Sequence, residues 1–156
     1  EELRRKSLDS MALGLLLHDV AMNKVPAFIL NKNTPLKQDE KDKIPPHVLG
    51  GMQIAQKMEL VEEEVRAACL EHHERLDGSG YPQRMKGTQI SSMGAMAAVA
   101  DSFSAMLQKR VYAEAKTPAA AAGELVNAAH LYEKRFSAAL QAAFVAGAFS
   151  SGSRAG

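Results

Sequence analysis

Hydrophobic residues recur along the chain with the period of an α-helix in several segments. The clearest segment runs from Val61 to His73, where apolar residues fall at steps of three and four and so share one helical face. His72 continues that inward face, and His73 lies about 100° around the helix from it. The pattern predicts a buried helix that ends in two adjacent histidines.

Six further segments have helical character, and no stretch alternates over the length of a β-strand, so we predict an all-α fold. Ser91 and Thr117 are suited to cap helices, because their hydroxyl oxygens accept hydrogen bonds from free N–H groups. Segments 19–35 and 77–90 are predicted loops. The six helical segments are residues 10–18, 38–43, 47–58, 93–109, 118–130 and 134–149, and residues 150–156 are expected to form a flexible tail.

The composition is that of an ordinary globular domain. The 156 residues are 46% hydrophobic and 24% charged, with a formal net charge of +1, so we expect one domain over residues 1–149 and no nucleic acid polymer as a partner. The single cysteine, Cys69, excludes an internal disulfide and favours a cytoplasmic location. No apolar run reaches the roughly 18 residues of a membrane span. The charged start resembles no signal peptide, and we expect the chain to be part of a longer protein.

A histidine pair and the turn after it carry the first candidate chemistry. The adjacent imidazoles of His72 and His73 are seldom needed for packing, because each buried nitrogen needs a hydrogen-bond partner. Neutral imidazole is, however, a common ligand for transition metals. In the turn, Gly78 and Gly80 permit unusual backbone angles and Pro82 restricts the exit. The pattern predicts metal ligands beside a rigid loop at the mouth of a pocket.

Other polar residues are ambiguous when each is considered alone. His18 and Asp19 could be only the polar end of a helix, and His47 could be a solvated loop residue. Asp101 stands within an apolar helix, where a carboxylate needs either an ion-pair partner or a cation. His130 is distant in sequence and is predicted to be a surface or core residue rather than a ligand.

Together these residues predict a two-metal centre with Asp19 as the bridging carboxylate. Two metals stabilise both the attacking and the leaving oxygen of an in-line displacement, which suits hydrolysis of a phosphate ester. Mixed nitrogen and oxygen ligands suit divalent iron, manganese, zinc, cobalt or nickel. The predicted ligands, more numerous than one ion needs, are His18, Asp19, His47, His72, His73 and Asp101.

The same residues resemble the signature of the HD-GYP family. The resemblance implies an HD-domain helical bundle with an HD-GYP C-terminal extension and a centre of two divalent ions, most often iron or manganese. It also implies hydrolysis of the bacterial messenger cyclic di-GMP to pGpG or GMP. The matching elements are His18-Asp19 for the HD pair, His47 and His72-His73 for the later histidines, residues 77–82 for the Gly-Tyr-Pro loop, and Asp101 for the last ligand.

The resemblance further implies roles for single residues. Asp19 and Asp101 would be catalytic as well as metal-binding, and Arg110 would clamp a substrate phosphate. An upstream regulatory domain in the same protein is expected, and a homodimer is allowed. The implied substrate contacts are Gly78, Tyr81, Arg110 and Tyr112.

Two positions depart from the family pattern. Met22 stands where the family has a lysine, and Ala113 stands where it has a second cation; neither side chain can clamp a phosphate or donate a proton. We hypothesise that Lys24 supplies the missing catalytic lysine. The upstream helix that often carries a further ligand has no counterpart expected before Met11. Two alternatives follow: a weakly active sensor or interaction module, or a phosphohydrolase for another nucleotide, such as a mixed-base cyclic dinucleotide.

Overall fold

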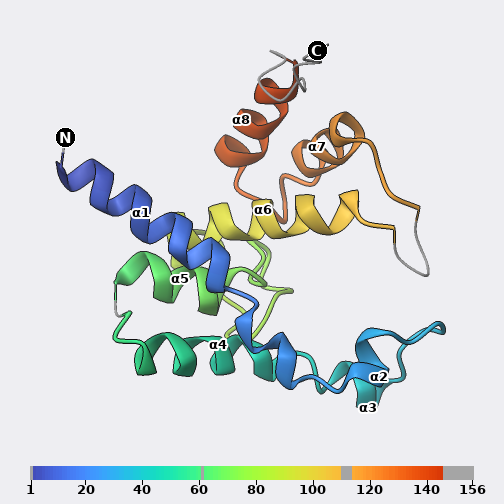
Figure 1. Ribbon diagram of the computed structural model, residues 1–156. Helices are drawn as coiled ribbons and strands as arrows, with labels where there is room; N and C mark the ends of the chain where they lie inside the picture. Colours follow the sequence, from blue (N-terminus) through green and yellow to red (C-terminus); the bar gives the residue numbers. More distant parts are fainter. Residues whose placement is uncertain (1, 61, 110–113, 146–156) are drawn as a thin grey trace, which may run out of the picture.

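The computed structural model describes residues 2–60, 62–109 and 114–145, and helices dominate these ranges (Figure 1). Over these residues the only β-type pairing is an isolated antiparallel bridge between Asp77 and Lys86, so the all-α prediction is confirmed. None of the helices in these ranges has the length and apolar character needed to cross a membrane. The elements are α1 (Glu2–Leu17), η1 (Val20–Lys24), α2 (Ala27–Leu30), α3 (Gln38–Lys41), α4 (Pro46–Lys57), α5 (Glu63–Glu71), η2 (Gly87–Gln89), α6 (Ser92–Leu107), α7 (Pro118–Asn127) and α8 (Lys134–Val145).

Helix α5 packs against α1, α4 and α6, while α7 and α8 pack against each other and against α6 (Figure 1). The side chains of Val65, Ala68 and Cys69 on α5 are fully buried. A Cβ at Gly14 would lie 3.0 Å from the Ala68 Cβ and 3.0 Å from the Glu64 carbonyl oxygen. Helix α1 can therefore lie close against α5 because position 14 has no side chain.

The first helix is longer than the sequence pattern predicts. Helix α1 begins at Glu2 and runs through Met11 to Leu17, so it starts well before the predicted start at Ser10. Its early turns are polar and show no apolar periodicity, but they gain tertiary contacts with α5. One of these is the hydrogen bond that Ser7 Oγ donates to Glu64 Oε1 over 2.9 Å.

The histidine-bearing helix is shorter than predicted. Helix α5 ends at Glu71, and His72 and His73 lie in the turn that follows. The Glu74 N–H bonds to the Glu71 carbonyl over 2.8 Å, which tightens the chain after the helix. Segment 19–35, predicted as a loop, contains η1 and α2. Val61, where helix α5 was predicted to begin, lies outside the described residues.

Both predicted helix caps are confirmed. The Ser91 Oγ accepts a hydrogen bond from the Gly94 N–H over 3.0 Å at the start of α6. The Thr117 Oγ1 accepts one from the Ala120 N–H over 3.3 Å at the start of α7. The remaining predicted helices agree with the observed bounds within a few residues, and the predicted end of the last helix at Phe149 lies outside the described residues.

A buried carboxylate holds the loop that follows the histidine pair. Glu74 is 1% exposed, and its two oxygens accept hydrogen bonds from the N–H groups of Gln83 (2.7 Å) and Met85 (2.9 Å). Residues 77–82 lie between Glu74 and these two N–H groups, so the carboxylate closes the loop on itself. No sequence pattern marks Glu74 as a buried anchor, because a Glu at a helix end is usually solvated.

We predict that Glu74→Ala lowers the free energy of unfolding by about 1–3 kcal/mol, because two N–H groups of the loop lose their charged acceptor. Urea denaturation measures the change. Glu63→Ala is the matched control, since Glu63 is exposed in the first turn of α5, and it should cost less than about 1 kcal/mol. Equal losses in the two variants would show that Glu74 does not anchor the loop.

Candidate metal centre

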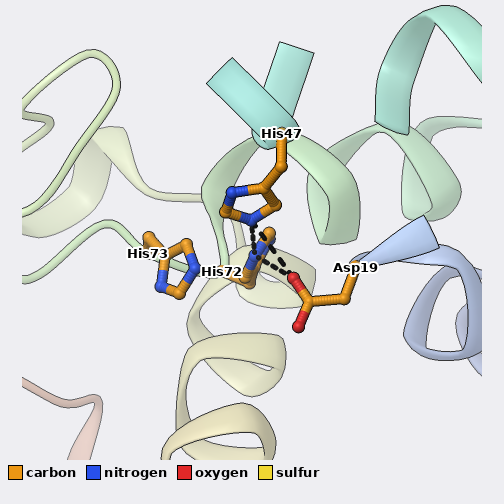
Figure 2. A group of neighbouring side chains, drawn as sticks. All are labelled: Asp19, His47, His72 and His73. Carbon is orange, nitrogen blue, oxygen red and sulfur yellow. Dashed lines mark hydrogen bonds and ion pairs between the residues drawn. The ribbon is translucent and has the colours of Figure 1, made fainter. Parts of the chain in front are cut away.

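The predicted ligands meet where the ends of several helices come together. His18 and Asp19 directly follow α1, His47 lies in the first turn of α4, and Asp101 lies within α6. Figure 2 shows the imidazoles of His47 and His72 directed at the Asp19 carboxylate, with His73 beside them. Helix α5 carries the histidine pair to this point because its apolar face is buried between α1 and α4.

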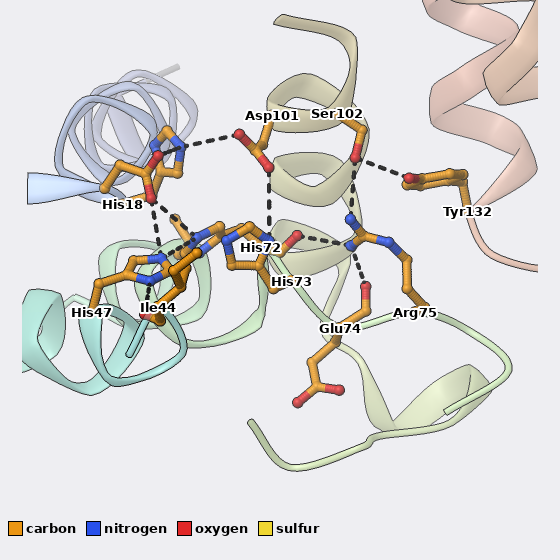
Figure 3. Close-up of polar contacts among 12 residues, drawn as sticks. His18, Ile44, His47, His72, His73, Glu74, Arg75, Asp101, Ser102 and Tyr132 are labelled. Atoms are coloured by element: carbon orange, nitrogen blue, oxygen red, sulfur yellow. Dashed lines mark hydrogen bonds and ion pairs between the residues drawn. The ribbon is translucent and has the colours of Figure 1, made fainter. Parts of the chain in front are cut away.

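Two groups of possible ligand atoms share Asp19, and within each group the atoms lie no more than 4.8 Å apart. In the first group, the Asp19 Oδ1 lies 3.1 Å from the His47 Nε2 and 3.5 Å from the His72 Nε2. In the second, the His18 Nε2 lies 3.7 Å from the Asp19 Oδ2 and 3.7 Å from the Asp101 Oδ1 (Figure 3). The first group is Asp19, His47, His72 and His73, and the second is His18, Asp19 and Asp101.

Backbone carbonyls set the orientation of three imidazoles. A carbonyl oxygen only accepts hydrogen bonds, so an Nδ1 that contacts one must carry the proton. The lone pair of a neutral ring is then on Nε2, which is the atom directed at the centre. The three contacts are His18 Nδ1 with the Leu15 oxygen (2.6 Å), His47 Nδ1 with the Ile44 oxygen (2.7 Å) and His72 Nδ1 with the Ala68 oxygen (2.8 Å).

This arrangement fits a divalent cation. With Nε2 of His47 unprotonated, the Asp19 Oδ1 is a buried oxygen without a hydrogen-bond donor among the described residues. The Nε2 atoms of His47 and His72 lie only 3.3 Å apart, and both side chains are fully buried. Lone pairs and a carboxylate this close repel one another unless positive charge lies between them. Imidazole and carboxylate donors are those that divalent transition ions accept.

The pKa shifts of the histidines and of Asp19 reflect the close approach of imidazoles and carboxylates at this centre. Burial alone would disfavour charged imidazoles, but contact with Asp101 and Asp19 outweighs it and raises the pKa of His18 and of His47. Burial of Asp19 is likewise outweighed by His47 and His72, so the pKa of Asp19 is lowered. Burial, followed by the nearby His72, lowers the pKa of His73 and favours its neutral ring. The raised pKa values of His18 and His47 favour a proton on these rings, which a bound metal ion would displace.

A cavity of about 1200 Å³ adjoins the centre. Asp19, His73 and Asp101 line it, together with the segment from α2 to Leu36 and the C-terminal half of α6. Pockets for drug-sized ligands usually measure about 300–1,000 Å³, so this one can hold a ligand as large as a dinucleotide.

The predicted substrate contacts lie in different places. Tyr81 is in the cavity wall, whereas Gly78, at φ +82°, is not. Met22 also lines the cavity, but Lys24 is exposed and lies beside Gly50 of α4, outside the lining residues. His130 is exposed, as one of the two alternatives for it predicted. The remaining positions, Arg110, Tyr112 and Ala113, lie outside the described residues.

The residues that connect the centre to the C-terminal helices were not among the predicted site residues. Arg75 Nη1 donates hydrogen bonds to the carbonyls of His72 (3.0 Å) and Glu74 (2.7 Å), and its Nη2 donates to Ser102 Oγ (3.2 Å). The guanidinium also lies over the Tyr132 ring, 4.9 Å from its centroid, and the Tyr132 hydroxyl donates to the same Ser102 Oγ (Figure 3). Their only mark in the sequence is their position near predicted ligands: Arg75 lies two residues after His73, and Ser102 directly follows Asp101.

Comparison with known proteins agrees with this geometry. A sequence profile described as the HD domain matches residues 1–135. A cyclic di-GMP phosphodiesterase of Pseudomonas aeruginosa is 38% identical over 100 residues, covering 64% of this chain and 24% of the relative. A cyclic di-GMP phosphodiesterase response regulator of Xanthomonas campestris is 37% identical over 120 residues, covering 76% of this chain and 30% of that protein.

A 3'3'-cGAMP-specific phosphodiesterase of Vibrio cholerae is 38% identical over 100 residues, covering 62% of this chain and 19% of the relative. The chain thus matches between 19% and 30% of the length of these relatives. The profile covers most of the chain, and the HD pair and the Gly-Tyr-Pro loop occupy neighbouring positions at one centre. The chain therefore belongs to the HD domain family, and within it to the HD-GYP proteins.

Proposed function

We propose that this domain is a metal-dependent phosphodiesterase that hydrolyses a cyclic dinucleotide, with cyclic di-GMP as the leading substrate and pGpG or GMP as product. The observation that carries the proposal is the pair of ligand groups that share Asp19 and adjoin a cavity of about 1200 Å³. The names of the relatives support the same class of substrate.

The two groups would hold two divalent transition ions, for which we propose iron or manganese. His47, His72 and His73 with Asp19 would hold one ion, and His18 and Asp101 with Asp19 would hold the other. When bound, such ions neutralise charge on the phosphate and activate water for attack on phosphorus.

Side chains of the cavity wall would bind the substrate. Burial and the nearby Asp19 raise the pKa of Tyr81 to about 12, so its hydroxyl stays protonated and can donate a hydrogen bond to a phosphate oxygen. Arg75 and Lys32 also line the cavity and bring positive charge to an anionic substrate. Both cations already have protein partners: Lys32 pairs with Glu40, and Arg75 donates hydrogen bonds to two carbonyls and to Ser102.

The roles assigned to Lys24, Gly78, Arg110 and Tyr112 stay predictions. Lys24 would have to change its position beside Gly50 to reach the cavity. The upstream regulatory domain, the homodimer and the cytoplasmic location also stay predictions.

One observation favours a second candidate function. Met22, in place of the family's lysine, lines the cavity, so a thioether occupies a position from which a cation would reach the substrate. The domain could therefore turn over cyclic di-GMP slowly and act as a binding module, or it could prefer a mixed-base cyclic dinucleotide. The presence of cGAMP-specific enzymes among the relatives supports testing both substrates.

We predict that Asp19→Ala abolishes metal loading and phosphodiesterase activity together, lowering kcat by about 10³-fold or more, because both ligand groups lose their shared carboxylate. Metal content per chain is measured on anaerobically purified protein, and cyclic di-GMP hydrolysis is measured with iron or manganese added. Asp39→Ala is the matched control: Asp39 is exposed in α3, and both readouts should stay unchanged. Full activity in the Asp19 variant would refute the two-metal proposal.

We predict that Met22→Lys raises kcat/KM for cyclic di-GMP by about 10- to 100-fold, because an ammonium group in the cavity can bind a phosphate or donate a proton to the leaving group. Met58→Lys makes the same chemical change at an exposed position directly after α4 and should leave the rate unchanged. Steady-state assays with cyclic di-GMP and cGAMP compare the variants. A Met22→Lys variant with no gain on cyclic di-GMP would favour a repurposed domain over a weakened enzyme.

A further inference from the structure

The four imidazoles of the centre are not oriented in the same way. His18, His47 and His72 each have an Nδ1 within hydrogen-bond distance of a backbone carbonyl. His73 has no such carbonyl partner within the described part of the chain. Its Nδ1 lies 3.9 Å from the Asp101 Oδ2, which is too long for a hydrogen bond. The rings of His72 and His47 lie beside it, at 4.1 Å and 5.1 Å between centroids, but these rings are ligands themselves. The orientation of the His73 ring therefore depends on a contact from outside the ligand set.

Tyr81 supplies that contact. Its ring centroid lies 4.6 Å from the centroid of the His73 ring, with an angle of 33° between the planes, within the range of offset-stacked aromatic pairs. The Tyr81 N–H also donates a hydrogen bond to the His73 carbonyl over 3.2 Å. The tyrosine thus contacts both the ring and the backbone of this one ligand.

The loop that carries Tyr81 is built to lie against the histidine. A Cβ at Gly80 would lie 2.4 Å from the His73 carbonyl oxygen and 2.5 Å from the Arg75 nitrogen, so only glycine allows this approach. On the far side, the buried Glu74 carboxylate holds the N–H groups of Gln83 and Met85. The position of Tyr81 is therefore fixed from both ends of the loop.

We propose that Tyr81 is the positioning residue for His73, and that it thereby sets the affinity of the first ligand group, Asp19, His47, His72 and His73, for its metal ion. The proposal rests on the two-metal site of the proposed function. Residues that orient metal ligands typically change metal affinity by about 10- to 100-fold. The second group, His18, Asp19 and Asp101, does not include His73 and should not respond.

The test is equilibrium dialysis of the 156-residue chain against Mn²⁺, with the two dissociation constants fitted from bound metal per chain. Tyr81→Leu and Tyr81→Met keep an apolar side chain but lose the planar ring, and each should weaken one ion by about 10- to 100-fold while leaving the other unchanged. Tyr81→Phe retains the ring and should keep both affinities. Ser79→Ala is the loop control, because Ser79 is exposed, and it should bind metal like the parent chain.

Each other outcome overturns the proposal. Unchanged affinities in the Leu and Met variants, with only KM for cyclic di-GMP raised, would make Tyr81 a substrate contact. Weakening in the Phe variant equal to that in the Leu variant would assign the effect to the hydroxyl group. Loss of both ions would show that Tyr81 supports the whole loop. A parent chain that binds a single ion would overturn the two-metal proposal itself, and that result is seen before any variant is compared.

Discussion

The negative charge of Asp19, whose Oδ1 atom is buried, is the constraint on which the rest of the centre depends. Its Oδ1 lies within 3.5 Å of two imidazole nitrogens, and its Oδ2 lies 3.7 Å from a third. A carboxylate in such surroundings is stable only beside positive charge. The fold meets this requirement by bringing imidazoles to one point from the end of α1, the start of α4 and the end of α5. Asp101, from α6, adds a second carboxylate and so increases the demand for a cation.

Helix ends perform two tasks at this centre. The last carbonyls of a helix lack N–H partners within the helix, and they are therefore free to accept hydrogen bonds from side chains. His18 and His72 each use the carbonyl three or four residues earlier, and His47 uses that of Ile44 just before α4. The same contacts that satisfy these carbonyls direct each Nε2 at Asp19. His73 is the exception, and an aromatic ring from the Gly-Tyr-Pro loop contacts it instead.

The C-terminal helices are tied to the centre through Arg75. Its guanidinium joins the carbonyls after α5 to Ser102 on α6 and to the Tyr132 ring. Changes in packing between α6 and the following helices can therefore reach the histidine pair through one side chain. The cavity is lined by the ligands Asp19, His73 and Asp101, by Arg75 and Ser102, and by the thioether of Met22.

The sequence by itself determined the identity of the six clustered polar residues, both helix caps and the all-α class, because ligand chemistry and helical periodicity are local properties of the chain. It could not determine the early start of α1, which depends on contacts with α5, or the role of Glu74, which depends on N–H groups nine and eleven residues away. Only the tertiary structure placed Met22 in the cavity and Lys24 outside it, and only it set Tyr81 against His73. Those outcomes depend on how closely segments distant in sequence approach one another, and packing between helices decides that distance.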